Sequence, residues 1–330
     1  MQFREYKIQA PRVRSLSWQG DALVDWVGGG AIYRLDGSHE TGKISYAYRF
    51  DAAVASPGGR FSAIYERRGT KGLLLDQGTI LRELNRSFYH AHDYNYPIAF
   101  VQLDGREFLA HCPEEYCRLE FEEVLSGKRA ASKTPRKPSD FFHSNLLASP
   151  SGRFLLDAGW VWHPWQVVML HDMGAALEDA AWLDRVETDL PQDTELYGGA
   201  FLDEQTVVLL GSGDGKPDSP DVWDRPHVLA VYDRAAKEYR SVVSTEEAVG
   251  SAMPVGDRHV IGFHGHPRLF DVQTGAIVHR WPHLPCGSRD GWFSDPALQP
   301  PLALDASKRR FALADGVDIV VVECGIPFLE

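Results

Sequence analysis

One hairpin pattern recurs along the chain at a spacing of about 47 residues and fills the 330 residues seven times. Its clearest copies span residues 53–65 and 147–156, and each has an apolar run, a Ser-Pro-x-Gly-Arg turn and a second apolar run that begins with Phe. Proline and glycine favour the turn, and branched or aromatic side chains suit a pleated, half-buried surface. Each copy therefore predicts an antiparallel β-hairpin.

Weaker copies of the hairpin occupy the rest of the chain. An early apolar residue after each of the seven turns gives separations of 38, 47, 46, 53, 53 and 51 residues, counted along Leu23, Phe61, Phe108, Phe154, Val207, Val260 and Phe311. A third and a fourth strand follow most hairpins, as at 228–233 with 238–242. Four strands per unit is the composition of a propeller blade.

The sequence thus predicts an all-β chain folded as one seven-bladed β-propeller over residues 1–330. The expected blades cover approximately residues 10–50, 51–85, 96–125, 144–190, 196–245, 250–282 and 300–330, and only residues 174–182 have a helical pattern. Eight blades, or six with a long insertion, are the alternatives.

The turns at 56–60 and 149–153, together with the Leu-Phe-Asp-Val-Gln-Thr-Gly segment at 269–275, resemble the WD-repeat and related propeller families. The resemblance extends over essentially the whole chain. The chain departs from the WD-repeat consensus because it lacks a regular Gly-His dipeptide before the first strand and the Trp-Asp pair that ends the third. It is therefore similar to a degenerate WD-repeat-like propeller, and the resemblance implies that a strand at about residues 3–8 pairs with the last blade and closes the ring.

The charge balance excludes a class of partner. The chain has 34 basic and 46 acidic side chains and a formal net charge of -12, which would repel a phosphate backbone, so we expect no nucleic-acid partner. No stretch approaches the roughly 18 apolar residues of a membrane span, and residues 1–20 lack an apolar leader. Four cysteines make no disulfide framework in a chain of this length. We therefore expect an acidic, cytoplasmic protein without a membrane partner.

The predicted blade order places two sets of connections on opposite faces. The turns between first and second and between third and fourth strands are short and polar, with arginines beside them at Arg60, Arg106, Arg153, Arg258 and Arg309. The other connections are long, at 86–96, 111–116, 127–143, 160–165, 211–227, 264–266 and 282–301. Long loops often carry function, so we expect the binding site on the face that they form.

Aromatic side chains are frequent in these long loops. The candidate anchors for a partner are Tyr94, Tyr96, Trp160, Trp162, His163, Trp165, Trp223 and Trp292, and Phe88, Tyr89, His90 and His92 lie in the same loops. Exposed aromatic rings at this density are typical of a binding surface. The alternative is that the rings fold back and pack beneath their own loops.

The favoured function is a non-catalytic binding module or scaffold that presents this aromatic and histidine-rich face to a protein or peptide. A small-molecule ligand is the other kind of partner. The basic run from Lys128 to Lys137 is interpreted as a mobile solvated loop, with a dock for an acidic partner as the alternative. A third interpretation buries the short-turn face, with its recurrent arginines, in a larger assembly.

No cofactor is expected except, as an alternative, a divalent metal ion. Imidazole is a common metal ligand, and the candidate ligands are His264, His266, His283 and Asp214. A metal there would make the chain a metal-assisted hydrolase or a lactonase-type propeller with its site at the central mouth. Nucleophilic catalysis has no positive signal, so the enzyme stays the second hypothesis. Cys324 is expected in the core, and Cys286 is the thiol that we would test for reactivity.

Overall fold

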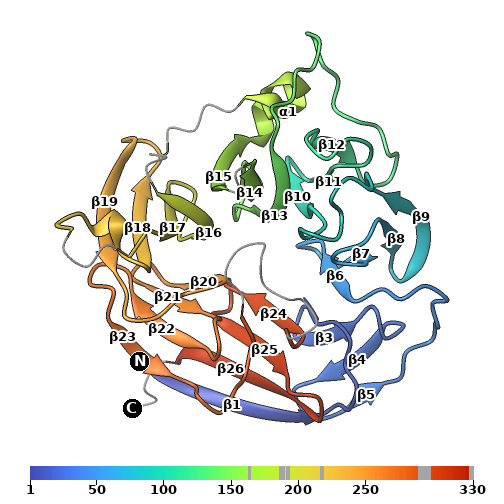
Figure 1. The fold of residues 1–330 in the computed structure, drawn as a ribbon. Coiled ribbons are helices and arrows are strands. Elements are labelled where there is room, and N and C mark those ends of the chain that lie inside the picture. The colour runs from blue at the N-terminus through green and yellow to red at the C-terminus, as the bar shows by residue number, and fades with distance from the viewer. Residues whose placement is uncertain (163–164, 186–189, 191–193, 216–218, 289–298, 327–330) are drawn as a thin grey trace.

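Seven antiparallel sheets succeed one another around a central axis in the computed structural model, which describes residues 1–162, 165–185, 190, 194–215, 219–288 and 299–326 (Figure 1). Each sheet follows its neighbour in sequence order, and the ring is a seven-bladed β-propeller. The fold predicted from the repeated hairpin is therefore confirmed.

The first three blades contain β2 to β12. Blade 1 has β2 (Ser17–Gln19), β3 (Ala22–Asp25), β4 (Ala31–Arg34) and β5 (His39–Glu40). Blade 2 has β6 (Ala52–Ala55), β7 (Phe61–Tyr65), β8 (Lys71–Asp76) and β9 (Thr79–Asn85). Blade 3 has β10 (Ile98–Leu103), β11 (Arg106–His111) and β12 (Glu120–Glu123).

The next three blades contain β13 to β23. Blade 4 has β13 (Phe142–Ala148), β14 (Phe154–Val161) and β15 (Trp165–Asp172), followed by the helix α1 (Met173–Glu178) and the 3₁₀ turn η1 (Ala180–Asp184). Blade 5 has β16 (Glu195–Phe201), β17 (Thr206–Ser212), β18 (Val228–Asp233) and β19 (Glu238–Ser244), with the 3₁₀ turn η2 (Val222–Asp224) between β17 and β18. Blade 6 has β20 (Ala252–Val255), β21 (His259–Gly262), β22 (Arg268–Asp271) and β23 (Ile277–Arg280).

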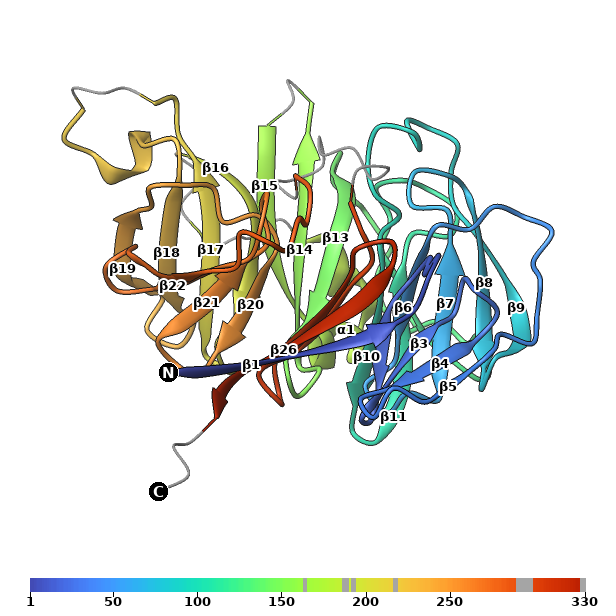
Figure 2. The same ribbon diagram turned by 90° about the horizontal axis from the view of Figure 1, so that it is seen from below.

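Blade 7 joins the two ends of the chain. It contains β24 (Leu302–Asp305), β25 (Arg310–Ala314), β26 (Asp318–Ile326) and, as its outermost strand, β1 (Gln2–Gln9). The strand β1 runs antiparallel to β26 from the pair of Gln2 with Ile326 to the pair of Gln9 with Asp318. In Figures 1 and 2 the blue β1 lies beside the red β26, which confirms the predicted closure.

Blades 3 and 4 differ from the four-stranded prediction, because each has three assigned strands among the described residues. In blade 3 the place of the fourth strand is taken by a short return of the chain, in which Glu122 and Arg129 form a bridge and the Ala130 amide donates to the Phe121 carbonyl at 2.7 Å. In blade 4 the alanine-rich segment after β15 forms α1 instead, whose N-terminal cap is the Asp172 carboxylate on the Ala175 amide. The helical pattern predicted for 174–182 is thus confirmed.

The hydrophobic core is divided among the contacts between neighbouring blades. Leu156 and Val168 of blade 4 pack against Leu209 and Ala230 of blade 5, and comparable clusters join every other neighbouring pair. Strands that are covered on both faces, such as β17 and β18 of blade 5, have continuous apolar runs rather than alternating ones. The larger core clusters of the described residues therefore lie between neighbouring blades.

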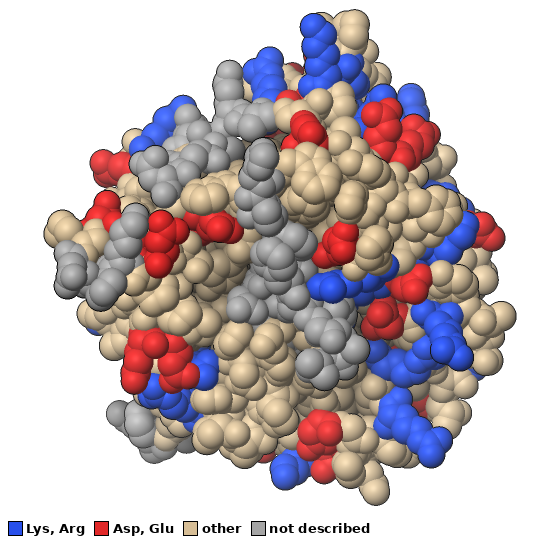
Figure 3. Space-filling view, in the orientation of Figure 1, with Lys and Arg blue, Asp and Glu red and all other residues tan. Residues whose placement is uncertain are grey.

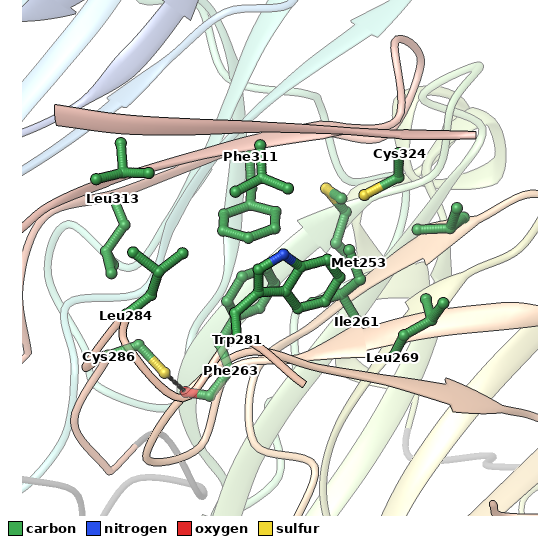
Figure 4. Packing of buried hydrophobic residues seen from close by; sticks show 13 residues of the cluster. Met253, Ile261, Phe263, Leu269, Trp281, Leu284, Cys286, Phe311, Leu313 and Cys324 are labelled. Atoms are coloured by element: carbon green, nitrogen blue, oxygen red, sulfur yellow. Dashed lines mark hydrogen bonds between the residues drawn. The ribbon is translucent and has the colours of Figure 1, made fainter. Parts of the chain in front are cut away.

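The cluster between blades 6 and 7 contains the two thiols considered in the sequence (Figure 4). Cys324 is buried there, as expected. Cys286 is also buried, and its Sγ donates to the Phe263 carbonyl at 2.9 Å. Because Cys286 lies in the core rather than in an exposed part of the long loop, thiol reagents in solution do not reach it in the folded protein.

The two Ser-Pro-x-Gly-Arg turns are built alike. The amides of Phe61 and Phe154 each donate to the hydroxyl of the serine that starts the turn, at 3.2 and 3.1 Å. Gly152 has φ +74°, a conformation that glycine adopts without the strain of a side chain. The repeated sequence thus specifies a repeated local structure.

Four of the five arginines beside the short turns pair within their own blades. They contact the acidic residue at the end of the third strand: Arg60 with Asp76 at 2.8 Å, Arg106 with Glu123 at 2.8 Å, Arg153 with Asp172 at 2.9 Å and Arg258 with Asp271 at 2.7 Å. The side chains of Arg60, Arg106 and Arg153 are about half exposed, and ion pairs at such positions contribute little to stability. In these four blades the arginine therefore neutralises the charge of the acidic residue at the end of the third strand.

The long and the short connections lie at opposite ends of the disc (Figure 2). The short β10–β11 turn is at the lower end of this view, and the described part of the loop that follows β17 rises at the upper end. We call the upper end the long-loop face. No helix among the described residues has the length and apolar character needed to cross a bilayer.

Candidate functional site

A cluster of aromatic rings lies on the long-loop face where blades 3 and 4 meet, and Phe142 is at its centre. The Phe142 ring stacks on Trp160 with centroids 3.9 Å apart and on Tyr116 at 4.4 Å. Trp162 and Tyr94 approach the same ring edge-on at 5.5 and 5.4 Å. Offset stacks and edge-on contacts are the favoured geometries of aromatic pairs, so the cluster forms a well-packed base.

The outer members of this cluster are exposed. Tyr89 is 45% exposed and Trp162 42%, and Phe88, next to Tyr89 in the chain, is 83% exposed. The His90 ring connects Tyr89 and Trp162, because its centroid lies 4.6 Å from Tyr89 and 5.2 Å from Trp162. We call Phe88, Tyr89, His90 and Trp162 the aromatic patch. Figure 3, which views this face, shows a largely uncharged surface over β10 to β13.

Two carboxylates lie beside the aromatic patch. Asp93 contacts His90 Nδ1 at 2.7 Å, and Asp140 accepts a hydrogen bond from the Tyr116 hydroxyl at 2.7 Å. Burial and the Asp140 carboxylate both raise the pKa of Tyr116 well above its ordinary value, so this hydroxyl stays protonated. The patch therefore combines apolar ring faces with a few fixed polar groups.

Three of the predicted anchors are buried in the floor of this region rather than exposed. Tyr94, Tyr96 and Trp160 are almost fully enclosed. The Arg86 guanidinium lies 4.5 Å from the Tyr94 ring and 5.0 Å from that of Tyr96. Burial raises the pKa of Tyr94 to about 12. For these residues the alternative expectation, that rings pack beneath their own loops, is the correct one, because the long loops close over the blade ends.

The remaining predicted anchors are spread around the ring. Trp165 is half-buried against Phe141 and its neighbours, and Trp223 packs in blade 5 with its ring 5.1 Å from Tyr239. His163 and Trp292 lie outside the described residues. Of the eight predicted anchors, Trp162 is thus the one that the structure shows in the exposed patch among the described residues.

The four predicted metal ligands are not assembled as one site. The His283 Nε2 is 3.0 Å from Glu5 on the outermost strand β1, and Asp214 is exposed in the loop of blade 5. The buried Arg268 guanidinium lies 3.5 Å from His266 Nδ1 and donates to the His264 carbonyl at 2.5 Å. Burial and this neighbouring cation lower the pKa of His266. A fixed cation beside the imidazole also opposes a metal ion.

A different group of side chains has metal-ligand spacing, and it is the one such group in the described ranges. His143, Asp157 and His171 are contributed by β13, β14 and β15 of blade 4, and their ligand atoms lie within 4.8 Å of one another. Asp157 Oδ2 is 2.5 Å from His143 Nδ1 and 3.2 Å from His171 Nε2. Their side chains are 4%, 0% and 3% exposed. We call them the His–Asp–His group.

The charge of this group is set by its imidazoles. Burial by itself would raise the pKa of Asp157, but the two neighbouring histidines lower it to about 2. An ionised carboxylate between two imidazoles can bind a proton or a cation. This group was not among the predicted sites, although the sequence holds one signal for it: Asp157 interrupts the apolar run that starts at Phe154.

The basic run is held against the protein rather than solvated throughout. Arg136 has a buried side chain and pairs with Asp184 at 2.7 Å and with Glu120 at 3.5 Å. Arg129 pairs with Glu114 at 3.2 Å. The mobile-loop interpretation is wrong for these two arginines, because acidic partners that are distant in sequence meet them in blades 3 and 4.

No protein-family model matches the sequence, and no curated protein matches it. Solved structures do resemble it. A chain of the mitotic checkpoint complex has a TM-score of 0.62 at 11% identity, with 98% of this chain and 91% of that chain covered. A chain of Kuenenia stuttgartiensis hydrazine synthase has a TM-score of 0.63 at 12% identity, with 96% and 97% covered.

A third similar structure is the β-propeller domain of Cps50 (Swd1) from Myceliophteria thermophila, with a TM-score of 0.58 at 9% identity and coverage of 98% of this chain and 100% of that one. One of the three comes from a protein complex and another from a synthase, so the likeness concerns the fold and leaves the activity open. Together with the seven sheets, these comparisons show that the chain has the fold of a seven-bladed β-propeller, as the resemblance in its sequence implied.

Proposed function

We propose that this propeller is a non-catalytic binding module that takes up a protein or peptide partner on the aromatic patch. The observation that carries the proposal is the exposure of Tyr89 and Trp162, whose rings pack against the buried Phe142, with the exposed Phe88 next to Tyr89 in the chain. Exposed rings held in place lose little conformational entropy on binding, and aromatic residues are enriched among the residues that dominate binding energy.

The patch is a better candidate than the whole long-loop face. Trp165 and Trp223 already use much of their surface in contacts within blades 4 and 5, so they have less area to offer a partner.

The four cysteines are free thiols, which supports the expectation of a reducing, cytoplasmic compartment.

The alternative of a metal-assisted hydrolase would need a metal with an open position that substrate can reach from the central mouth. The His–Asp–His group is enclosed between blades, so a substrate does not reach it. The aromatic patch offers ring surface rather than placed catalytic groups. A binding module is therefore the function that the geometry supports best.

Site-directed photo-crosslinking tests the proposal. A benzoylphenylalanine replaces Phe88 in one variant and Trp182 in another, and both are expressed in the cells from which the chain comes. Trp182 is a matched control, because it is 42% exposed like Trp162 but lies on η1, outside the long loops. We expect a discrete protein adduct from position 88 that is lost when Trp162→Ala is added. Folded protein with no adduct at position 88 beyond that at position 182 would contradict the proposal.

A further inference from the structure

Three strands of one blade contribute polar side chains to the same enclosed point. Leu155 packs with the core of blade 3, whereas Leu156 packs with that of blade 5. Because side chains two residues apart on a strand share a face, Asp157 points toward blade 3. His171 and His143 meet it from the strands on either side of β14. The His–Asp–His group is thus sealed in the interface between blades 3 and 4.

The orientation of His143 is fixed from outside the group. Its Nδ1 faces Asp157, and its Nε2 lies 3.2 Å from the carbonyl oxygen of Cys117. A histidine that binds a metal through one ring nitrogen usually donates its other N–H to a carbonyl or a carboxylate, which fixes the tautomer and the ring plane. The Cys117 carbonyl supplies this support for a metal at Nδ1.

Only one of the two Asp157 carboxylate oxygens takes part in the hydrogen bonds of the group within the described part of the chain. Asp157 Oδ1 is buried and has no hydrogen-bond partner among the described residues, and the whole side chain is 0% exposed. An unsatisfied buried acceptor is costly, because it has lost its water without gaining a donor. A cation bound by the carboxylate would remove that cost.

The spacing also fits one ion. Two ligand atoms with bonds of about 2.1 Å to the same ion are at most about 4.2 Å apart. The three ligand atoms lie within 4.8 Å of one another, so the widest pair needs to close by about half an ångström at most. Two imidazoles and a carboxylate are a donor set that divalent transition metals of the zinc type accept.

The geometry points to a structural site for one divalent transition-metal ion, with His143 Nδ1, the Asp157 carboxylate and His171 Nε2 as its protein ligands. The ion joins the first, second and third strands of blade 4. The three side chains are almost fully enclosed, so the ion enters during folding or through local opening of the interface between blades 3 and 4. This site is separate from the aromatic patch, and its test is independent of the proposed function.

The first measurement is the metal content of the wild-type chain. The protein is grown, and separately refolded, with Zn²⁺, Co²⁺ or Mn²⁺ and is then exchanged into EDTA. A buried ion survives brief chelation, whereas an ion on surface histidines does not. We expect one ion per chain, with an X-ray absorption spectrum of nitrogen and oxygen ligands that includes two imidazoles. Folded wild-type protein without retained metal, or a sulfur-ligated ion, overturns the proposal and leaves a purely hydrogen-bonded group.

A variant provides the second measurement. His171→Gln keeps a donor for Asp157 but removes a metal ligand, and His39→Gln, at an exposed position on β5, is the control. We expect His171→Gln to weaken metal retention by more than the roughly 10–100-fold that loss of a supporting hydrogen bond costs, and His39→Gln to retain the ion. Equal retention by the two variants overturns the assignment. If His171→Gln does not fold, the wild-type metal content and spectrum decide.

Discussion

The ring of Phe142 stacks on the indole of Trp160 with centroids 3.9 Å apart and planes inclined by 11°. This pair is the base on which the aromatic patch rests. Both rings are buried, whereas Trp162, which meets Phe142 edge-on, is 42% exposed.

The stack separates residues that maintain the fold from residues available to a partner. We expect Phe142→Ala to lower the free energy of unfolding by about 3–5 kcal/mol, because it leaves a cavity in a packed cluster. Trp162→Ala should cost less than about 1 kcal/mol, since much of the side chain is already in water. Chemical denaturation followed by circular dichroism measures both values. Comparable losses would mean that Trp162 is a core residue and not a contact for a partner.

The β13–β14 turn of blade 4 and the β10–β11 turn of blade 3 offer a matched pair of glycines. Gly152 and Gly105 have φ +74° and +73°, but a Cβ on Gly152 would meet the Gln102 carbonyl oxygen at 2.0 Å, whereas nothing lies within 4 Å of one on Gly105. Gly105→Ala should cost about 1–2 kcal/mol from backbone strain alone. Gly152→Ala should cost about 1–3 kcal/mol more, because blades 3 and 4 must separate locally. Thermal unfolding of the two variants measures the difference. Equal decreases in melting temperature for Gly152→Ala and Gly105→Ala would exclude close packing at the turn that contains Gly152.

The ion pair between Arg82 of blade 2 and Glu122 of blade 3 predicts that the stability of the fold depends on pH. Arg82 Nη2 is 2.6 Å from Glu122 Oε1, and His111 Nε2 lies 3.4 Å from the same oxygen. Burial by itself would raise the pKa of Glu122, but His111 and Arg82 lower it below its ordinary value of 4.5. The carboxylate therefore stabilises the fold above its unfolded pKa, and this contribution is lost as the pH falls through the folded pKa.

Glu122→Gln isolates this contribution. At neutral pH the variant should be less stable by about 1–3 kcal/mol, because a charged hydrogen bond is lost. The difference from wild type should stay level above about pH 5 and shrink as the pH falls below about 4.5. Urea unfolding at a series of pH values measures it. A difference that stays constant down to pH 3 would show that this carboxylate is not held ionised by the pair.

Closure of the ring depends on β1. Ile8 is buried against the core between blades 7 and 1, whereas Lys7 on the same strand is exposed. Ile8→Ala should lower the free energy of unfolding by about 2–5 kcal/mol, and Lys7→Ala, a change within the same pairing register, should cost about 0.5 kcal/mol or less. Equilibrium denaturation distinguishes them. If Ile8→Ala is as mild as Lys7→Ala, the strand contributes little to closure.

Local patterns were enough to predict the repeated elements. The Ser-Pro-x-Gly-Arg turns, the apolar runs and their regular spacing indicated the hairpins, the blade number and the closing strand, because turn dihedrals and strand burial depend on neighbouring residues. The missing fourth strand of blade 3 was not predicted, whereas the helical pattern at residues 174–182 indicated the departure in blade 4. In blade 4 the segment after Asp172 has a capped helical turn, and in blade 3 Arg129 returns to Glu122 over a tight connection.

The site was less predictable than the fold. Aromatic content alone did not distinguish Trp160 from Trp162, because two residues along one strand and its turn separate a buried ring from an exposed one. His264 and His266 are close in sequence and were therefore candidates, whereas His143, Asp157 and His171 are 14 residues apart at each step and meet only through strand pairing.

What the sequence determined by itself is the period of the structure and the chemistry of each turn, since both arise from contacts a few residues long. What only the tertiary structure decided is which side chains share an interface: the stack around Phe142, the pair of Arg82 with Glu122 and the enclosure of Asp157. Those contacts depend on the register between strands and the packing between blades, and residues far apart in the chain set both.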